Sequence, residues 1–194
     1  MPEKIILSGV PETMLQTLYA RARESWGRGV IRDKKAEELI ARLRREVPGI
    51  AIRTTLLVGF PGESEEDFAE LTDFVERQRF DRLGVFPYSA EEGTPSAEMA
   101  DDVPEEVKQA RVERIMELQR NISHEANVAR IGRKLRVVVD RREGDYYVAR
   151  SEYDSPEVDQ EILIPVAEGR LLPGEFREVV VTACEEYDLY GRLA

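Results

Sequence analysis

The sequence predicts an α/β unit followed by a small antiparallel β-barrel of OB-like type. A buried strand pattern at residues 50–60 leads through a tight turn into an amphipathic helix at residues 64–79, and a second strand pattern follows at residues 82–86. A strand–helix–strand unit of this length implies two parallel neighbouring strands joined by a right-handed crossover. After Gly132 the period changes from helical to alternating, and about five short strands then indicate the barrel.

The bulk composition describes a globular chain with an excess of acid. Its 194 residues, enough for one large or two small domains, carry a net charge of −11. This acidity argues against strong general affinity for nucleic acid. It is typical of a protein with a basic partner, and equally of a protein whose charge only keeps it in solution. The single cysteine, Cys184, excludes an internal disulfide and any multi-cysteine metal site. Because no apolar run could span a bilayer and no signal peptide is visible at Met1, we expect a cytoplasmic protein.

The first part of the chain reads in order as alternating helices and strands. Residues 3–7 predict a short strand, and Pro11 opens a helical pattern that continues to Ala22. A second amphipathic helix is predicted at residues 34–45. In the helix at residues 64–79, Ser64 is a plausible N-cap and Asp67 imitates a capping box. The longest helix opens at Pro104 and runs to about residue 130, with many charges outward and four apolar residues inward: Val107, Ile115, Leu118 and Ile122.

The predicted barrel strands cover residues 134–140, 146–150, 161–166, 176–183 and 189–193. Turns with Gly or Pro separate them, at residues 143–144, 155–156 and 173–174. The last 62 residues contain 9 basic and 14 acidic residues, a net charge of −5. Tyrosines offer stacking surfaces, but an RNA-binding barrel should be basic. A polycationic protein segment therefore fits this domain better than a nucleic acid.

Several residues could carry a function, and each also has a plain structural interpretation. The turn from Gly59 to Gly62 follows a buried strand, where glycines let a ligand approach the backbone; an ordinary strand-to-helix turn has the same sequence. Glu91 and Glu92 could act as general acids or bases, or be solvated loop carboxylates. The single histidine, His124, is interpreted as a surface or packing residue. Cys184 is interpreted as a half-buried hydrophobic residue.

From about residue 41 to residue 194 the chain resembles the radical-SAM methylthiotransferases. The resemblance rests on RTTLLVGFPGE at residues 53–63, on YSAEEGT at residues 88–94 and on the terminal barrel, which looks like a TRAM domain. Within the family, the Glu-Glu-Gly-Thr form is similar to the RimO-type branch, whereas the tRNA-modifying MiaB branch usually has an arginine in that loop. Residues 154–159 (DSPEVD) and 186–191 (EYDLYG) also resemble the RimO type.

The resemblance implies methylthiolation of an aspartate side chain on a basic ribosomal protein, the twelfth of the small subunit. It implies S-adenosyl-L-methionine and 4Fe-4S clusters as the family's cofactors. The fold it implies is the C-terminal part of a TIM-like parallel barrel followed by the TRAM barrel. The implied cofactor-binding residues are Gly59, Phe60, Pro61, Gly62 and Arg53. The implied substrate-binding residues are Glu91, Glu92, Asp154, Glu157 and Asp159.

The chain departs from the family in its cysteines. The family holds one cluster on a Cys-x-x-x-Cys-x-x-Cys motif and a second on three further cysteines, and none of these is present. We therefore expect no cluster and no metal in this chain, and a substrate-docking part that is inactive alone. The alternatives are a non-catalytic TRAM module that binds a basic ribosomal protein or RNA, and a relative of the tRNA methylthiotransferases.

The beginning of the chain departs in another way. Residues 8–22 and 31–36 look like the N-terminus of class I S-adenosylmethionine-dependent methyltransferases, although the glycine-rich cofactor motif of that group does not follow. This suggests a junction between two families; the alternative is a diverged methylthiotransferase lead-in. The predicted domains are an atypical helical lead-in at residues 1–40, the end of the α/β barrel with its long helix at 41–131, and the TRAM barrel at 132–194.

Overall fold

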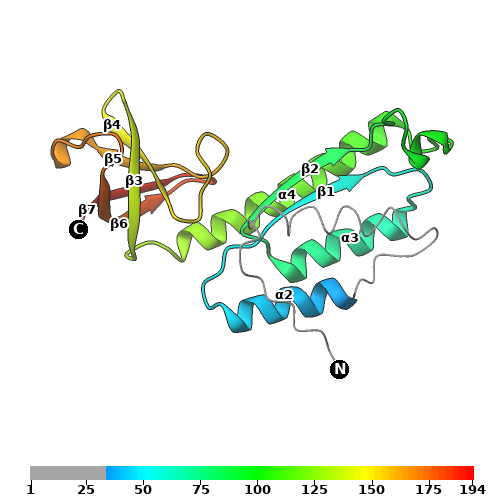
Figure 1. Ribbon diagram of the computed structural model, residues 1–194, viewed down its shortest axis with the longest axis horizontal. Coiled ribbons are helices and arrows are strands. Elements are labelled where there is room, and N and C mark those ends of the chain that lie inside the picture. Colours follow the sequence, from blue (N-terminus) through cyan, green and yellow to red (C-terminus); the bar gives the residue numbers. More distant parts are fainter. Residues whose placement is uncertain (1–33) are drawn as a thin grey trace. The chain divides into compact units, whose positions relative to one another are not determined.

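The computed structural model describes residues 34–194 (Figure 1). The strand predicted at residues 3–7 and the helix predicted from Pro11 lie outside these residues. The described chain forms two compact units, one made of residues 34–78 and 83–116 and the other of residues 79–82 and 117–194. None of the helices in the described part has the length and apolar character needed to cross a membrane.

The first unit contains helices and a two-stranded sheet. Its elements are α2 (Lys34–Glu46), β1 (Arg53–Val58), α3 (Glu65–Gln78), most of β2 (Arg82–Pro87), a 3₁₀ turn (Pro95–Glu98) and the first half of α4 (Glu105–Val128). The backbone N–H of Tyr88, just after β2, donates to the carbonyl of Val58, the last residue of β1, over 2.8 Å. The carboxyl ends of the two strands therefore lie together, so the strands are parallel (Figure 1). Two strands do not establish a TIM-like barrel, which stays a prediction.

Helix α3 begins at a capping box in which aspartate takes the usual place of glutamate. The N–H of Asp67 donates to Ser64 Oγ over 3.1 Å, and the N–H of Ser64 donates to Asp67 Oδ2 over 2.9 Å. Leu71, Phe74 and Val75 are buried along one face of the helix, as their three- and four-residue spacing predicts. The capping pair and this apolar face explain why the helix begins directly after the turn that ends β1.

Helix α4 confirms its predicted apolar face only in part. Ile115 and Ile122 are buried, whereas Val107 and Leu118 are half-buried. Most charged residues of the helix are exposed, as predicted, but Lys108 and Arg111 are both buried. These two residues lie on the inward face because they have acidic partners there, described below.

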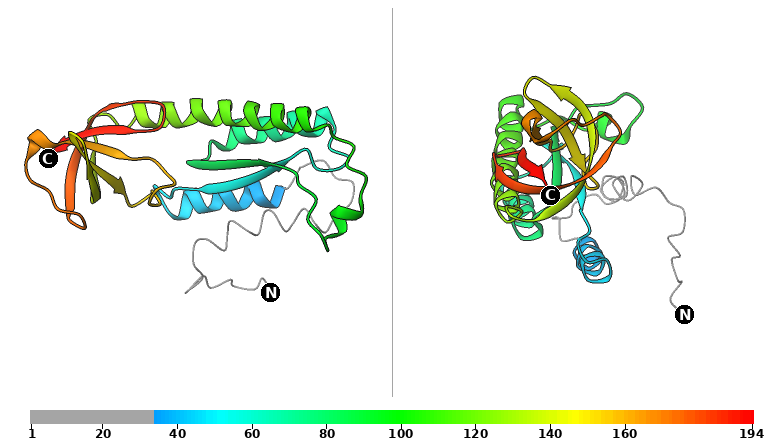
Figure 2. Two further views of the ribbon diagram at one scale, coloured as in Figure 1. Left: turned by 90° about the horizontal axis from the view of Figure 1, so that it is seen from above. Right: turned by 90° about the vertical axis from the view of Figure 1, so that its left-hand side faces the viewer.

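The second unit contains a closed five-stranded barrel, as the alternating pattern predicted. Its strands are β3 (Lys134–Glu143), β4 (Tyr146–Ser151), β5 (Ile162–Pro165), β6 (Phe176–Cys184) and β7 (Leu189–Leu193). They close in the order β3-β4-β5-β7-β6, and the right-hand view of Figure 2 shows these strands, coloured from yellow to red. The prediction of a purely antiparallel barrel needs one correction, because β5 and β7 are parallel, with Ile162 opposite Leu189. The ring order with one parallel pair is that of an OB-like barrel.

The barrel core is filled by the inward-facing residues of all five strands. Alternate residues on each strand point inward, as strand geometry requires. Gly191 on β7 lies so close to β6 that a Cβ there would be 2.2 Å from Val179 Cγ1, so glycine is needed at this crossing. Leu171, from the link between β5 and β6, joins the core. The buried cluster consists of Val137, Val139, Tyr147, Ala149, Ile162, Ile164, Leu171, Val179, Val181 and Leu189.

Candidate functional site

The turn after β1 brings together four of the five residues predicted to bind the cofactor. Gly59 and Gly62 have φ angles of +73° and +81°, a region that glycine enters at little cost. Phe60 packs edge-on against the ring of Tyr88, with ring centroids 5.2 Å apart. Arg53 begins β1, at the opposite end of the strand from the turn. Whether these residues bind a cofactor stays a prediction.

The backbone donors of this turn are already used by carboxylates of the chain. The N–H of Gly59 donates to Glu63 Oε1 over 2.9 Å, and that of Gly62 donates to Asp102 Oδ1 over 2.7 Å. A carboxylate that accepts a backbone N–H satisfies the same group that an incoming ligand would need. As it stands, the turn offers a cofactor no open backbone donor at either glycine. This arrangement favours the plain interpretation of a strand-to-helix turn.

Two buried cations from α4 hold the turn in place. Lys108 has a side chain that is 4% exposed; its Nζ lies 2.6 Å from Asp101 Oδ2 and 5.3 Å from the centre of the Tyr88 ring. Arg111 has a side chain that is 5% exposed, and its Nη1 donates to Glu63 Oε1 over 2.9 Å. Because a buried charge is costly without a partner, these contacts identify Lys108 and Arg111 as structural counter-charges to the acidic residues.

The sequence contains a signal for these cations that the prediction missed. On α4 the buried residues Arg111, Ile115, Gln119 and Ile122 follow one another at intervals of four, four and three. Polar residues at these intervals share the apolar face of a helix. The acidic run that begins at Glu63 supplies the partners of Arg111, whereas Lys108 pairs with Asp101.

Glu91 and Glu92 lie in the exposed loop after β2. The hydroxyl of Thr94 donates to the backbone carbonyl of Glu91 over 2.8 Å, which fixes the loop, while both carboxylates remain exposed. The loop is held further by Tyr88, whose hydroxyl donates to the carbonyl of Ser96 over 2.9 Å. The carboxylates are available to a partner, and their role in substrate binding stays a prediction.

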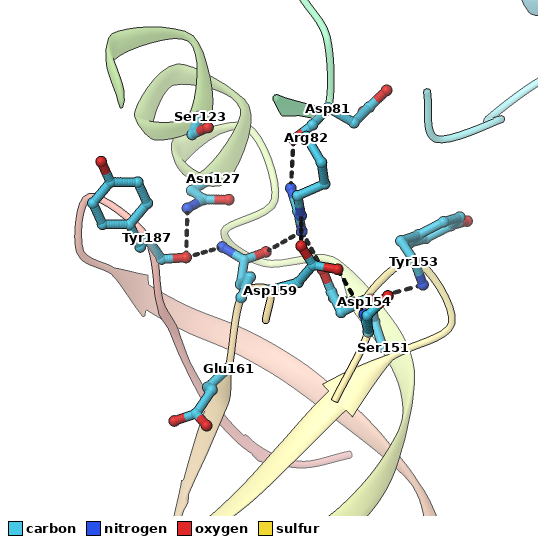
Figure 3. A network of polar contacts seen from close by, with 12 residues as sticks. Asp81, Arg82, Ser123, Asn127, Ser151, Tyr153, Asp154, Asp159, Glu161 and Tyr187 are labelled. Atoms are coloured by element: carbon cyan, nitrogen blue, oxygen red, sulfur yellow. Dashed lines mark hydrogen bonds and ion pairs between the residues drawn. The ribbon is translucent and has the colours of Figure 1, made fainter. Parts of the chain in front are cut away.

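Two of the three acidic residues predicted to dock substrate in the barrel loop are instead buried, and they belong to the polar network around Arg82 that Figure 3 shows. The Asp154 side chain is 1% exposed; it is ion-paired with Arg82 and accepts a hydrogen bond from Ser151 Oγ. The Asp159 side chain is 4% exposed, and its Oδ1 lies 3.9 Å from Arg82 Nε. The prediction that Asp154 and Asp159 lie on a docking surface is therefore wrong, because both carboxylates are buried in ion pairs with the guanidinium of Arg82. Glu157 is exposed, and its predicted docking role stands as a prediction.

The same network contains a second arginine. Arg130 Nη1 donates to Gln160 Oε1 over 2.8 Å, and Arg82 Nη2 contacts the same oxygen at 3.4 Å. Burial, and then the charge of Arg82, lower the pKa of Arg130 below its ordinary value. Gln160 Nε2 donates to the carbonyl of Tyr187, which also accepts from Asn127 Nδ2 at 3.3 Å (Figure 3). This network ties the loop between β4 and β5 to α4 and to the turn between β6 and β7, and it is structural.

The remaining candidates have the structural roles predicted for them. Cys184 is half-buried and packs against the barrel core. His124 is exposed, with Nδ1 3.5 Å from the carbonyl oxygen of Glu185. Within residues 34–194, no group of three or more His, Cys, Asp or Glu side chains is placed to hold a metal ion. With one cysteine in its sequence, the chain does not fit a cluster that needs three thiolates.

Comparison with known proteins identifies the barrel and the relatives of the chain. Residues 131–194 match the TRAM domain family. A curated protein called "Ribosomal protein uS12 methylthiotransferase RimO" from Bacteroides thetaiotaomicron is 53% identical over 157 residues, which are 80% of this chain and 36% of that protein. The protein of the same name from Porphyromonas gingivalis is 55% identical over 163 residues, 82% of this chain and 38% of that protein.

A third relative aligns with most of the first 40 residues as well. The protein of the same name from Bacteroides fragilis is 45% identical over 190 residues, 97% of this chain and 42% of that protein. This alignment takes in nearly all of residues 1–40, so it does not support a junction with a class I methyltransferase. It favours the alternative, a diverged methylthiotransferase lead-in. The chain is therefore similar in sequence to proteins named as RimO methylthiotransferases and spans about two fifths of their length, and its residues 131–194 match the TRAM domain family.

Proposed function

We propose that this chain is the substrate-docking part of a methylthiotransferase that modifies an aspartate of ribosomal protein uS12. The observation that carries the proposal is an identity of 45–55% with proteins named for that activity, over 80–97% of the chain. A ribosomal-protein substrate would place the reaction in the cytoplasm.

The cofactors of the proposed reaction are those of the family, S-adenosyl-L-methionine and 4Fe-4S clusters. The clusters would supply the electron that cleaves S-adenosylmethionine, and thiolates would hold them. This chain has one cysteine, so cluster ligation would fall to residues outside these 194. What its own residues contribute is a braced turn at the ends of β1 and β2, an exposed acidic loop at Glu91 and Glu92, and the TRAM barrel.

Charge supports a basic protein as the docking partner. The TRAM region has a net charge of −5 and the whole chain −11. Asp154 and Asp159 of the TRAM region are ion-paired with Arg82 and buried. The exposed residues of the predicted substrate-binding set are therefore Glu91, Glu92 and Glu157. Complementary charge accelerates the encounter of partners and fixes their register more than it raises affinity.

A second candidate is an RNA-binding module without chemistry of its own. It is favoured by exposed tyrosines of the second unit, Tyr146, Tyr153 and Tyr187, because aromatic rings stack with unpaired bases. The negative charge opposes it, since RNA binding gains most of its free energy from phosphate neutralisation.

One titration separates the two candidates. The purified chain is titrated with uS12 and, separately, with a single-stranded RNA, at several salt concentrations. We expect saturable binding of uS12, weakened in the variant Glu91→Gln/Glu92→Gln but not in the matched control Glu37→Gln/Glu38→Gln on α2. Tight RNA binding with a steep salt slope, or no binding of uS12, would contradict the proposal.

A further inference from the structure

A cavity at one end of the TRAM barrel brings together polar groups that the proposed function does not use. It has a volume of about 420 Å³ and lies between the β3–β4 hairpin and the link from β5 to β6. Its size is that of a site for a small molecule or a single side chain. The lining residues are Arg142, Tyr147, Val166, Gly169, Arg170, Leu171 and Pro173.

The two arginines of this cavity have no carboxylate partner among the described residues, in contrast to three other arginines of the barrel. Arg141, Arg150 and Arg177 are each paired with a carboxylate. Within residues 34–194, Arg142 and Arg170 are exposed and neither has an ion-pair partner. Arg142 uses only its Nε, which donates to the carbonyl of Gly144 over 3.3 Å, so its terminal nitrogens remain available.

Most acidic side chains near the cavity form ion pairs or hydrogen bonds with groups other than Arg142 and Arg170. Glu143 pairs with Arg141, and Glu175 pairs with Arg177. Glu168 accepts the backbone N–H of Leu193 over 3.2 Å. Asp145, in the turn after Arg142, is the exception: its exposed carboxylate has no hydrogen-bond or ion-pair partner among the described residues. The guanidinium groups are therefore not neutralised from within the barrel end.

Tyr147 adds a third donor. It belongs to the barrel core, is 6% exposed and also lines the cavity. Its hydroxyl makes no hydrogen bond to any residue in the described part of the chain, and it is not among the buried unpaired side-chain atoms there, so the oxygen is accessible to a ligand. An anion in the cavity would accept from this hydroxyl and from both guanidinium groups.

We infer that this cavity binds a carboxylate attached to an apolar group. A guanidinium group binds a carboxylate through two parallel hydrogen bonds, and Val166, Leu171 and Pro173 supply an apolar wall for the rest of the ligand. A phosphate chain would meet the negative charge of the whole domain, whereas a single carboxylate meets only the local arginines. The ligand is either a free organic acid or the C-terminal residue of a polypeptide. This inference does not depend on the methylthiotransferase proposal.

The test uses the whole chain and a pair of probes that differ in charge alone. N-acetyl-L-leucine carries the carboxylate, and N-acetyl-L-leucinamide is its neutral counterpart. Binding is followed by amide chemical shifts in NMR spectra. We expect the acid to bind at least roughly tenfold more tightly than the amide, the loss expected when a charged hydrogen-bonding group is replaced.

Variants locate the site and report on each donor. Arg142→Gln and Arg170→Gln should each weaken binding of N-acetyl-L-leucine about tenfold. Tyr147→Phe, which keeps the ring but removes the hydroxyl, should weaken it roughly threefold. Arg192→Gln removes the same charge from β7 at a residue that does not line the cavity, and it should leave binding of the acid unchanged. Asp145→Asn should strengthen binding. Circular dichroism confirms that each variant is folded.

Two further arms distinguish the source of the ligand and its chemistry. A peptide that ends in a free leucine and binds more tightly than N-acetyl-L-leucine indicates a polypeptide terminus, and the reverse order indicates a free acid; both outcomes support the site. The inference is overturned if the amide binds as well as the acid, or if both arginine variants behave like Arg192→Gln. It is also overturned if inorganic phosphate or an RNA oligonucleotide displaces N-acetyl-L-leucine at a concentration lower than that at which N-acetyl-L-leucine itself binds.

Discussion

The side chain of Lys108 fills the space beside Gly59: a Cβ on Gly59 would lie 2.3 Å from Lys108 Cγ. Lys108 is buried there between the turn after β1, the ring of Tyr88 and Asp101. The glycine that resembles a family signature is thus required by the packing of this chain itself. This requirement for glycine can be tested by measuring the free energy of unfolding of a variant, without any ligand.

Gly59→Ala should lower the free energy of unfolding by about 2–4 kcal/mol. About 1 kcal/mol comes from the φ of +73°, and the rest from overpacking against Lys108. Gly62→Ala is the matched control, because its φ of +81° is similar but no atom lies within 4 Å of its Cβ position. It should cost only about 1 kcal/mol. Urea denaturation measures both, and equal losses would show that Lys108 does not restrict the turn.

Arg82→Met should destabilise the second unit by about 3–5 kcal/mol, because it leaves the buried carboxylates of Asp154 and Asp159 without their cation. Arg120→Met is the control within the second unit: Arg120 Nε lies 3.6 Å from Glu186 Oε2, but both side chains are exposed, so the loss should stay below about 1 kcal/mol. Denaturation followed by tyrosine fluorescence of the barrel provides the measurement. If the two variants lose the same stability, the Arg82 network does not hold the barrel loop.

Tyr190 should titrate above the ordinary tyrosine pKa of 10.0. Its hydroxyl donates to Glu185 Oε1 over 2.9 Å, and this hydrogen bond is the first cause of the raised pKa. Because the pKa is higher in the folded chain, the stabilisation is present below the unfolded pKa and is lost as pH rises through the folded one. Glu185→Gln should bring the Tyr190 pKa back toward 10.0. Ultraviolet difference titration measures it, with Tyr190→Phe used to assign the signal; an unchanged pKa in Glu185→Gln would exclude this cause.

The chain reconstituted with iron and sulfide should hold no 4Fe-4S cluster and form no 5′-deoxyadenosine from S-adenosylmethionine. One cysteine cannot provide the thiolates that such a cluster needs. Iron content, the visible absorption spectrum and chromatography of the nucleoside products give the measurement. Cys184→Ser should behave like the parent chain, since Cys184 packs against the barrel core. Stoichiometric iron together with turnover would contradict the expectation that the chain is inactive alone.

Much of the local structure could be read from the sequence. The strand at Leu189–Leu193 has the predicted bounds, and helices α2 and α3 begin and end within a residue of theirs. These elements are specified locally, by periodicity and by caps such as the Ser64–Asp67 pair. The candidate turn at residues 59–62 was also found from the sequence, because a strand that ends in two glycines marks a change of direction.

The sequence by itself determined the described elements, their order and the similarity to known proteins, since each depends on neighbouring residues or on similarity along the chain. Tertiary structure alone decided which charges are buried. Arg82 and Asp154 are 72 residues apart, and no periodicity within the loop distinguishes a docking carboxylate from one that pairs with a distant arginine. Tertiary structure also decided that β5 and β7 pair in parallel, because closing the barrel joins strands that are not consecutive in the sequence. Burial of a charge depends on a partner elsewhere in the fold, whereas a local pattern records only the face on which a residue lies.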